Sequence, residues 1–286
     1  VILYFSFLLI ATPQTIIVLN NPLPFLLPSH FEPVLFLGKM GFGYYGAENT
    51  DAIFILYLVK EKVYIIHIPR DLVVPLGSDL YKINSLYAFK KIDYLLKEVS
   101  SLTGLRVKKY IVFDAYLLRK IVDQLGGLEV ELKYPVVDAV SGYTLVPGRY
   151  KLSGEWIEWV VRSRYHPEGD FYRMKNQFII LKALQRKIIS TKRQELISLF
   201  TLISREKSHY ETNFNVFKLI DLLDKLRKIS PQKFQEVIIG LDSGYWQSGY
   251  FNLRVNGAKI LTYGLIPKDG VGNYQTIRKK IKESLK

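Results

Sequence analysis

The most informative stretch of the chain reads Arg162-Ser163-Arg164-Tyr165-His166-Pro167-Glu168-Gly169-Asp170-Phe171-Tyr172-Arg173, with Gln177 four residues further on. Pro167-Glu168-Gly169 predicts a tight turn, because proline presets φ and glycine accepts a left-handed conformation. Asp170 then stands where a helix N-cap belongs, ahead of a run with apolar residues at helical spacing. The stretch therefore predicts a sharp turn that leads into a long helix.

Charged side chains are concentrated around this turn. Arg173 and Gln177 are four residues apart and share one face of the predicted helix, while Arg162 and Arg164 arrive from the other side of the turn. Guanidinium groups that converge on a helix N-terminus are typical of a site for phosphate or pyrophosphate. A solvated basic surface held by Asp170 and Glu168 explains the same spacing, so the pattern alone leaves both readings open.

A second polar cluster follows a predicted strand at residues 63–68. That strand ends in Pro69-Arg70-Asp71, and Lys82-Ile83-Asn84 comes eleven residues after Asp71. Upstream, Asn49-Thr50-Asp51 opens another apolar strand. Loops at strand ends of α/β sheets often carry function, although an Arg-Asp pair there is more often a surface salt bridge.

The remaining pattern predicts an α/β fold, with a layered central mixed sheet flanked by helices. Apolar and β-branched runs predict strands at residues 34–37, 52–59, 63–68, 110–113, 128–132, 236–241, 249–255 and 259–265. Helical spacing predicts helices at 91–102, 115–125, 153–161, 171–189, 193–205, 214–228 and 274–285. Strands that alternate with helices favour this layered arrangement. The apolar residues Trp156, Trp159, Val160 and 178–181 flank the arginine turn and are core candidates that could also line a lipid groove.

Composition narrows the classes of function. The 286 residues include no cysteine, which excludes disulfides, thiol nucleophiles and thiolate metal sites. The formal net charge of +14 favours anionic partners. No nucleic-acid motif accompanies this charge, and the aromatic residues do not form a stacking platform, so we expect no nucleic-acid partner.

The N-terminal segment differs from the rest of the chain. Residues 1–31 contain no Asp, Glu, Lys or Arg, and residues 1–11 are nearly all apolar. The initial run is shorter than the roughly 20 residues that span a bilayer. We interpret residues 1–31 as the remnant of a membrane anchor followed by a linker, and residues 32–286 as one domain; a buried N-terminal element is the alternative.

Taken in order, the motifs resemble the LytR-CpsA-Psr family of cell-envelope glycopolymer transferases. They are Thr50-Asp51, Ile68-Pro69-Arg70-Asp71, Lys82-Ile83-Asn84 with Tyr87-Ala88, Asp123-Gln124-Leu125-Gly126-Gly127-Leu128-Glu129-Val130, Leu152-Ser153-Gly154-Glu155, and Arg162-Ser163-Arg164 through Gln177. The resemblance covers roughly half of the chain, from about Val34 to about Lys187.

The resemblance implies a membrane-anchored enzyme with its domain on the extracytoplasmic face. It would move a glycopolymer from a polyprenyl-pyrophosphate carrier to peptidoglycan or a similar envelope acceptor. Arg70, Arg162, Arg164, Arg173 and Gln177 would bind the pyrophosphate, and Lys82 would line the same site. Asp51 would be a carboxylate associated with Mg²⁺, and Asp71 would orient Arg70 or assist proton transfer.

The sequence departs from the family pattern at two positions. Lys39-Met40 follows Leu37-Gly38 where the family has an aspartate, and Asn49 replaces an arginine two residues before Asp51. Lys39 or Glu48 would substitute in part for the aspartate and the arginine that this chain lacks. These departures leave two alternatives to the transferase, which are a non-catalytic polyprenyl-(pyro)phosphate-binding protein and a hydrolase of the pyrophosphate link.

Overall fold

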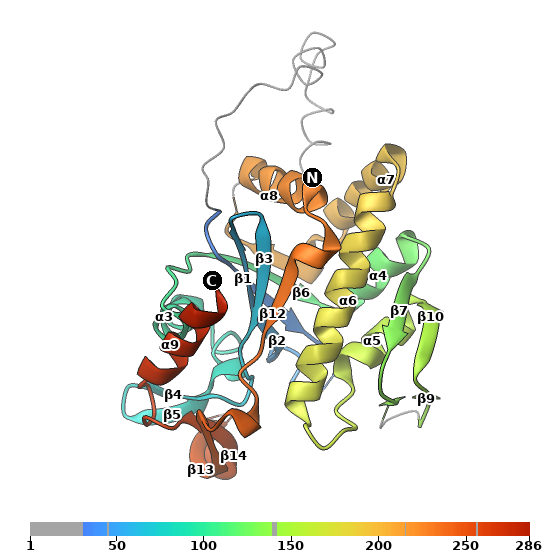
Figure 1. Cartoon of the computed structure of the whole chain (residues 1–286). Coiled ribbons are helices and arrows are strands. Elements are labelled where there is room, and N and C mark those ends of the chain that lie inside the picture. Colours follow the sequence, from blue (N-terminus) through green and yellow to red (C-terminus); the bar gives the residue numbers. More distant parts are fainter. Residues whose placement is uncertain (1–30, 45, 139–141, 215, 256) are drawn as a thin grey trace.

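A six-stranded mixed sheet forms the centre of the computed structural model, which describes residues 31–286 except 45, 139–141, 215 and 256 (Figure 1). The strand order is β11-β6-β1-β2-β3-β12. The strands are β1 (Val34–Lys39), β2 (Thr50–Val59), β3 (Lys62–His67), β6 (Lys109–Asp114), β11 (Tyr210–Thr212) and β12 (Phe234–Val237). The layered mixed α/β sheet that the sequence predicts is thus confirmed.

Both parallel and antiparallel pairing occur in this sheet. β1 runs antiparallel to β2 and parallel to β6, and β3 runs antiparallel to β2 and parallel to β12. β2 turns into β3 at Lys60 and Glu61, whose φ values are 47° and 63°. Two consecutive positive φ values match the twist of a two-residue hairpin, which fixes the register of β2 against β3.

Alternating residues of the strands bury the two faces of the sheet under different helices. Leu35, Leu37 and Ile55 pack with α3 (Ile92–Thr103) and α9 (Gln275–Ser284), which lie together on one side of the sheet in Figure 1. Val34, Phe54 and Ile65 pack on the other side with α6 (Asp170–Ser190) and α8 (Val216–Lys228). The period of two along each strand therefore creates two apolar layers.

A smaller apolar cluster lies beyond α6. It joins α4 (Ala115–Gln124) and α5 (Gly154–Arg162) to the antiparallel pair β7 (Leu128–Leu132) and β10 (Gly148–Leu152). Gly154 lets α5 approach α4, because a Cβ at this position would lie 2.7 Å from the Cα of Arg119. The Gly154 N–H also donates to Asp123 at 2.8 Å. These contacts place the end of α5 beside α6.

Two hairpins lie at one end of the sheet. They are β4 (Val73–Leu76) with β5 (Asp79–Lys82), and β13 (Trp246–Val255) with β14 (Ala258–Pro267). The remaining elements are β8 (Val136–Val137), β9 (Thr144–Leu145), α7 (Arg193–Arg205), and the 3-10 helices η1 (Ile83–Ser85), η2 (Lys207–His209), η3 (Pro231–Lys233) and η4 (Leu241–Ser243).

Most predicted elements are confirmed within a few residues, and the differences are local. The strand predicted at 236–241 is β12, which lies at Phe234–Val237, and Leu241 instead begins η4. The sequence pattern did not predict the short strands β4, β5, β8, β9, β10 and β11. The predicted anchor lies outside the described residues, apart from Phe31. Among the residues that the structure describes, no helix is both long and apolar enough to cross a membrane.

Candidate functional site

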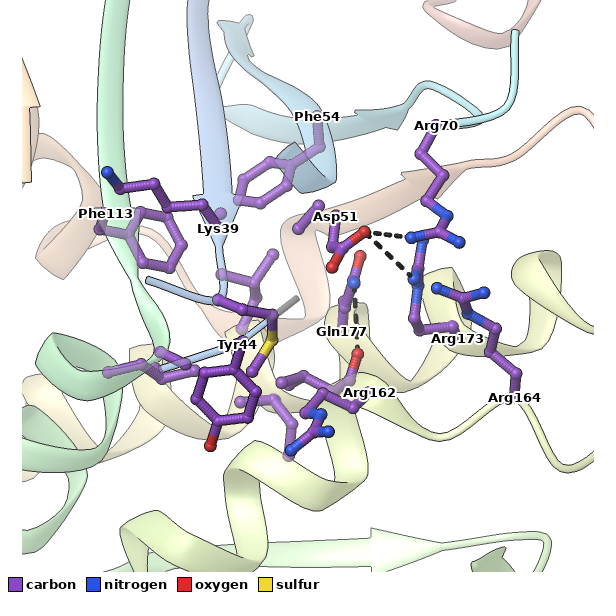
Figure 2. Close-up of a pocket in the computed structure, with 18 of the residues that line it drawn as sticks. Lys39, Tyr44, Asp51, Phe54, Arg70, Phe113, Arg162, Arg164, Arg173 and Gln177 are labelled. Carbon is purple, nitrogen blue, oxygen red and sulfur yellow. Dashed lines mark hydrogen bonds and ion pairs between the residues drawn. The ribbon is translucent and has the colours of Figure 1, made fainter. Parts of the chain in front are cut away.

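A cavity of about 500 Å³ opens at the sheet edge where β1 and β6 end and β2 begins, and α5 and α6 form its other wall. Figure 2 shows Arg70, Arg164 and Arg173 on one side of this cavity, and Phe113, Lys39 and Tyr44 on the other. The polar and charged lining residues are Lys39, Tyr44, Asp51, Arg70, Arg162, Arg164, Arg173 and Gln177. Six residues that the sequence predicts as site residues therefore meet in one cavity.

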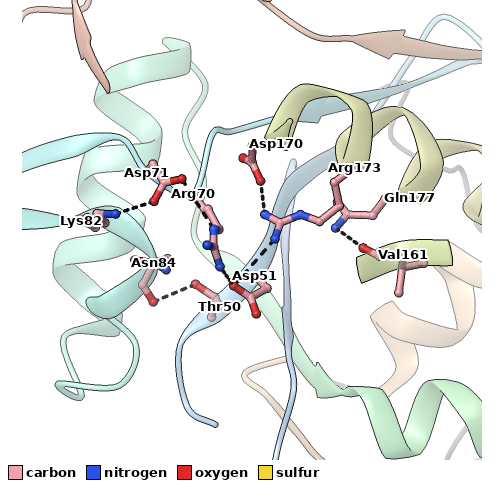
Figure 3. Close-up of polar contacts among 10 residues, drawn as sticks. All are labelled: Thr50, Asp51, Arg70, Asp71, Lys82, Asn84, Val161, Asp170, Arg173 and Gln177. Atoms are coloured by element: carbon pink, nitrogen blue, oxygen red, sulfur yellow. Dashed lines mark hydrogen bonds and ion pairs between the residues drawn. The ribbon is translucent and has the colours of Figure 1, made fainter. Parts of the chain in front are cut away.

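Arg70 is fixed by the carboxylates of two neighbouring elements. It follows β3, forms an ion pair with Asp51 of β2, and has its Nε 3.7 Å from Asp71 Oδ2 (Figure 3). Burial alone would lower the pKa of Arg70, but Asp51 and Asp71 outweigh burial and raise it. The guanidinium is therefore always charged. Asp51 lies inside β2 rather than before it, since the strand begins at Thr50.

Asp71 and Lys82 lie behind Arg70 and do not line the cavity. Lys82 Nζ donates to Asp71 Oδ1 at 2.8 Å. Burial favours a raised pKa for Asp71, but Arg70 and Lys82 together lower it, so the carboxylate stays ionised. The geometry gives Asp71 a positioning role toward Arg70. Lys82 was predicted to line the site, but it contacts Asp71 and does not reach the cavity.

Backbone contacts explain the Lys82-Ile83-Asn84 motif. The Asn84 N–H donates to the Arg70 carbonyl at 3.3 Å, and the Thr50 hydroxyl donates to the Asn84 carbonyl at 3.2 Å. The Asp71 carbonyl accepts from the Leu265 N–H of β14 at 2.9 Å. The turn η1 and the late hairpin thus hold the loop that carries Arg70 against β2.

The turn before α6 departs in one respect from the sequence analysis. Gly169, with φ of 52°, occupies the N-cap position, and Asp170 is the first helical residue. The Asp170 side chain makes no capping hydrogen bond and instead forms an ion pair with Arg173. The left-handed glycine already turns the chain into the helix, which frees the carboxylate to bind a guanidinium.

Arg173 is the most buried of the site arginines. It is 2% exposed, and its Nη1 lies 4.0 Å from Asp51 Oδ1. Burial lowers its pKa to about 10, with Asp170 acting against this shift and Arg70 adding to it. One turn further along α6, Gln177 Nε2 donates to the Val161 carbonyl at 3.4 Å (Figure 3). The predicted shared face of these two residues is thus confirmed.

Arg164 and Arg162 have different surroundings. Arg164 is exposed and forms no salt bridge within the part of the chain that the structure describes. Its pKa is lowered by burial of the guanidinium region and by the neighbouring Arg70. Figure 2 shows Arg164 with Arg70 and Arg173 on one side of the cavity, whereas Arg162 lies apart beside Tyr44.

Arg162 is held by a carboxylate that the sequence analysis missed. Its Nη1 donates to Glu158 Oε1 at 2.9 Å, and its guanidinium lies 5.1 Å from the centre of the Tyr44 ring. Glu158 is 3% exposed and also accepts from the Tyr44 hydroxyl at 2.8 Å. The i, i+4 spacing of Glu158 and Arg162 was the available signal. Tyr44 gave no sequence signal, because its contact spans 114 residues.

One of the two departures from the family pattern, Lys39, forms an ion pair at the cavity. Lys39 and Met40 line the cavity, and Lys39 Nζ donates to Glu48 at 2.7 Å and 2.9 Å. Asn49 does not line the cavity, and its N–H donates to the Gly46 carbonyl at 2.8 Å. Lys39 is therefore the substitute that faces the cavity, and Glu48 neutralises it.

Apolar side chains cover the other side of the cavity. They are Phe54, Phe113, Ala115, Leu118, Val161, Ile180, Leu181 and Leu184. Ile180 and Leu181 were among the candidates for a lipid groove. Trp159 instead stacks on Tyr143 with ring centroids 5.0 Å apart, and Val160 is fully buried in the smaller apolar cluster. The cavity therefore joins a cationic end to an apolar wall.

The donor set of the cavity fits a metal ion that takes most of its ligands from a substrate. Asp51 is the carboxylate that lines the cavity, and the described residues contain no group of three or more His, Cys, Asp or Glu side chains able to hold a metal. Mg²⁺ commonly binds through one or two carboxylates together with substrate phosphates and water. Asp51 meets this requirement.

Comparison with known proteins gives a consistent set of matches. A model of the LytR_cpsA_psr family matches residues 32–263. Regulatory protein MsrR of Staphylococcus aureus (strain COL) is 26% identical over 150 residues, which are 51% of this chain and 46% of MsrR. Polyisoprenyl-teichoic acid–peptidoglycan teichoic acid transferase TagU of Enterococcus faecalis is 26% identical over 136 residues, 43% of this chain and 44% of TagU. The chain spans about half the length of the curated relatives that it matches.

Solved structures share the fold at low sequence identity. The crystal structure of B. subtilis TagV superposes with a TM-score of 0.67 and 22% identity, covering 91% of this chain and 98% of TagV. The structure of TagT bound to LIIa-WTA superposes with a TM-score of 0.66 and 20% identity, covering 88% of each chain. These likenesses extend the match from the motif region to nearly the whole fold.

Proposed function

Because the chain belongs to the LytR_cpsA_psr family, we propose that it transfers a glycopolymer from a polyprenyl-pyrophosphate carrier to peptidoglycan or another cell-envelope acceptor. The proposal rests on one observation: Arg70, Arg164 and Arg173 line the same cavity as an apolar wall. A lipid diphosphate has the matching form, with a dense anion at one end and an apolar chain at the other. The names of the similar proteins TagU and the TagT complex support this substrate class.

The arginines contribute to catalysis by stabilising charge. When an acceptor hydroxyl oxygen forms its bond to the glycopolymer, its proton passes to water, the bond to the lipid-linked phosphate breaks and negative charge grows on the leaving phosphate oxygen. Guanidinium groups held at the cavity by Asp51, Asp71 and Asp170 can meet this charge once the diphosphate is bound. Asp71 is a weak base because Arg70 and Lys82 lower its pKa, so its part is to orient Arg70.

The proposal includes a Mg²⁺ ion, for which Asp51 would be the protein ligand. The ion would be held by this carboxylate and by the diphosphate oxygens, and it would supply Lewis-acid neutralisation of phosphate charge. Arg70 and Arg173 now contact the Asp51 carboxylate, and in the bound state their N–H groups are expected to face the diphosphate instead.

Location at the outer face of the cell membrane is part of the same proposal. Residues 1–31 would serve as the single-pass anchor, and the folded domain would lie on the extracytoplasmic side. A lipid-linked substrate then stays at the membrane while its diphosphate and the adjoining part of its lipid chain enter the cavity. The anchor is tested separately, by asking whether a chain lacking residues 1–31 leaves the membrane fraction.

The site is tested by substituting Arg164, because no carboxylate in the described part of the chain loses a salt-bridge partner when this side chain changes. We expect Arg164→Gln to weaken binding of a polyprenyl diphosphate by roughly 10- to 100-fold, the loss of one charge-assisted contact. Arg106→Gln, at an exposed arginine away from the cavity, is the matched control. Binding is measured by titration, and co-purified lipid by mass spectrometry.

Turnover separates the transferase from the two alternatives. The Lys39–Glu48 ion pair, which stands near the position of a family carboxylate, is the observation that favours a binding protein without turnover. A transferase needs Mg²⁺ and a glycan acceptor for product to form, a hydrolase releases product without the acceptor, and a binding protein forms none. Equal lipid affinity of Arg164→Gln and wild type would show that the anion site is wrongly assigned.

A further inference from the structure

A second cavity, of about 580 Å³, lies on a different face of α6 from the arginine cavity. Tyr172, Asn176, Ile179 and Arg186 of α6 line it, whereas Arg173, Gln177 and Leu184 line the first cavity. At 100° per residue the mean directions of these two sets differ by about 125°, so they point to different sides of the helix. The other walls come from residues 131–134 at the end of β7 and from Glu236 of β12.

The charge of this second cavity is predominantly positive. Lys133, Lys182 and Arg186 line it without a carboxylate within 4.0 Å, as far as the described residues show. The Arg186 guanidinium donates to the Glu129 carbonyl at 3.3 Å, and Lys182 Nζ lies 5.5 Å from the centre of the Phe178 ring. Lys175 also lines the cavity, and Glu131 and Glu236 are its acidic lining residues, so four basic side chains outnumber two acidic ones and favour an anionic ligand.

Polar and aromatic groups complete a site that suits sugar rings. Asn176 is 2% exposed, its Nδ2 has no partner at hydrogen-bond distance, and its amide lies close enough to the Tyr172 hydroxyl to act against burial, which raises the pKa of that tyrosine. The ring of His166 stacks on Tyr172 at 4.7 Å and lies 5.0 Å from Tyr134, which is itself 50% exposed. Aromatic faces cover the apolar faces of sugars, and a buried amide without a partner is suited to bind a hydroxyl or acetamido group.

Both cavities extend to the N-terminal end of α6. Arg173 lines the first cavity and the adjacent Tyr172 lines the second, while the turn before the helix places Arg164 at the first cavity and stacks His166 on Tyr172. Lys175 lines the second cavity and pairs with Glu168 of the same turn at 2.5 Å. A chain held by a phosphate at the arginines can therefore reach the second cavity by crossing this turn.

We propose that the second cavity binds a segment of anionic glycan, a sugar chain bearing phosphate or carboxylate groups. The inference rests on the proposed transferase function, because such an enzyme must hold both a glycopolymer and an acceptor strand near the diphosphate. Either chain has the required chemistry. A polyol-phosphate oligomer represents the transferred polymer, and an oligosaccharide of acetylated amino sugars with peptide carboxylates represents the acceptor.

The test titrates these two lipid-free probes, and a polyprenyl diphosphate, into the protein and two charge-matched variants. Lys133→Gln/Lys182→Gln alters the second cavity, and Lys279→Gln/Lys280→Gln removes the same charge from exposed positions of α9. We expect at least tenfold weaker binding of one probe to the first variant only, and that probe identifies the chain. Lipid affinity and melting temperature should stay unchanged in both variants.

The failure of this inference is distinguishable from failure of the transferase proposal. If lipid binds but neither glycan probe does, or if both variants bind the probe equally, the second cavity is not a glycan site. If lipid fails to bind wild type while the first variant still loses glycan affinity, the glycan site stands and the diphosphate assignment falls.

Discussion

Glu236 offers a quantitative test of the structure, because at its carboxyl group the effect of burial on the pKa outweighs that of the neighbouring positive charges. Its side chain is 26% exposed, and its Oε1 has no hydrogen-bond partner. Burial raises the pKa of Glu236 to about 7, while Lys175 and Lys182 act in the opposite direction. His67 Nε2 lies 3.8 Å away, but burial lowers the pKa of His67 to about 3, so this ring is neutral and does not pair with the carboxylate at neutral pH.

The raised pKa makes the stability of the protein depend on pH. The folded state holds the Glu236 proton more tightly than the unfolded state, in which the pKa is 4.5. The stabilisation is therefore fully present below pH 4.5 and is lost as pH rises to about 7. A change of 2.5 units, 7 minus 4.5, corresponds to about 3 kcal/mol, and the partial exposure of the side chain reduces the expected value to about 2 kcal/mol.

Urea denaturation of wild type and Glu236→Gln between pH 4.5 and 8.5 measures this effect. The variant should gain about 2 kcal/mol relative to wild type across the range, because glutamine cannot ionise. Glu283→Gln, at an exposed position of α9, should follow wild type at every pH. Titration of His67 is common to the three proteins and cancels in the differences. A difference between wild type and Glu236→Gln that is the same at both ends of the range would refute the burial of this carboxyl group.

Two further predictions concern residues that position the first cavity. Asp71→Asn should weaken polyprenyl-diphosphate binding about tenfold although Asp71 does not line the cavity, because Arg70 and Lys82 lose a common partner. Asp79→Asn, on the neighbouring hairpin, is the control. Equal lipid affinities of Asp71→Asn and wild type would exclude the positioning role. Gly154→Ala should lower the free energy of unfolding by about 2 kcal/mol or more, because its Cβ would lie 2.7 Å from the Arg119 Cα. Gly249→Ala should lower it less, because the nearest atom to its Cβ, in the Phe251 ring, would be 3.6 Å away. Equal melting temperatures of the two variants would contradict the close packing of α4 and α5.

The sequence predicted the central strands because their own residues determine them. β1, β2 and β3 are apolar runs long enough to be recognised, and β7 alternates between buried and exposed residues along its whole length. β4 contains Pro75, and β11 has three residues that form a strand only by pairing with β6. Such strands depend on tertiary contacts, which a local pattern does not contain.

The sequence predicted most of the polar residues that line the candidate cavity, but not how they are arranged. The arginines on both sides of the turn do line one cavity, yet Glu158 binds Arg162 and separates it from the other three. Asp170 was predicted to cap the helix, and the positive φ of Gly169 removed the need for that role. Lys82 was placed at the cavity, but the pairing of β5 with β4 sets it behind Asp71. Each difference arises from a partner that is distant in sequence or from backbone conformation.

The two-sided use of α6 limits how this protein can evolve. The helix has 21 residues, a length of about 30 Å, and side chains at adjacent positions such as Tyr172 and Arg173 serve different cavities. Inserting or deleting one residue within it would rotate every later side chain by about 100°, and would move Gln177 and Arg186 out of their cavities together. Homologues with this architecture should therefore vary along α6 by substitution alone and accept changes in length only in the loops at its ends.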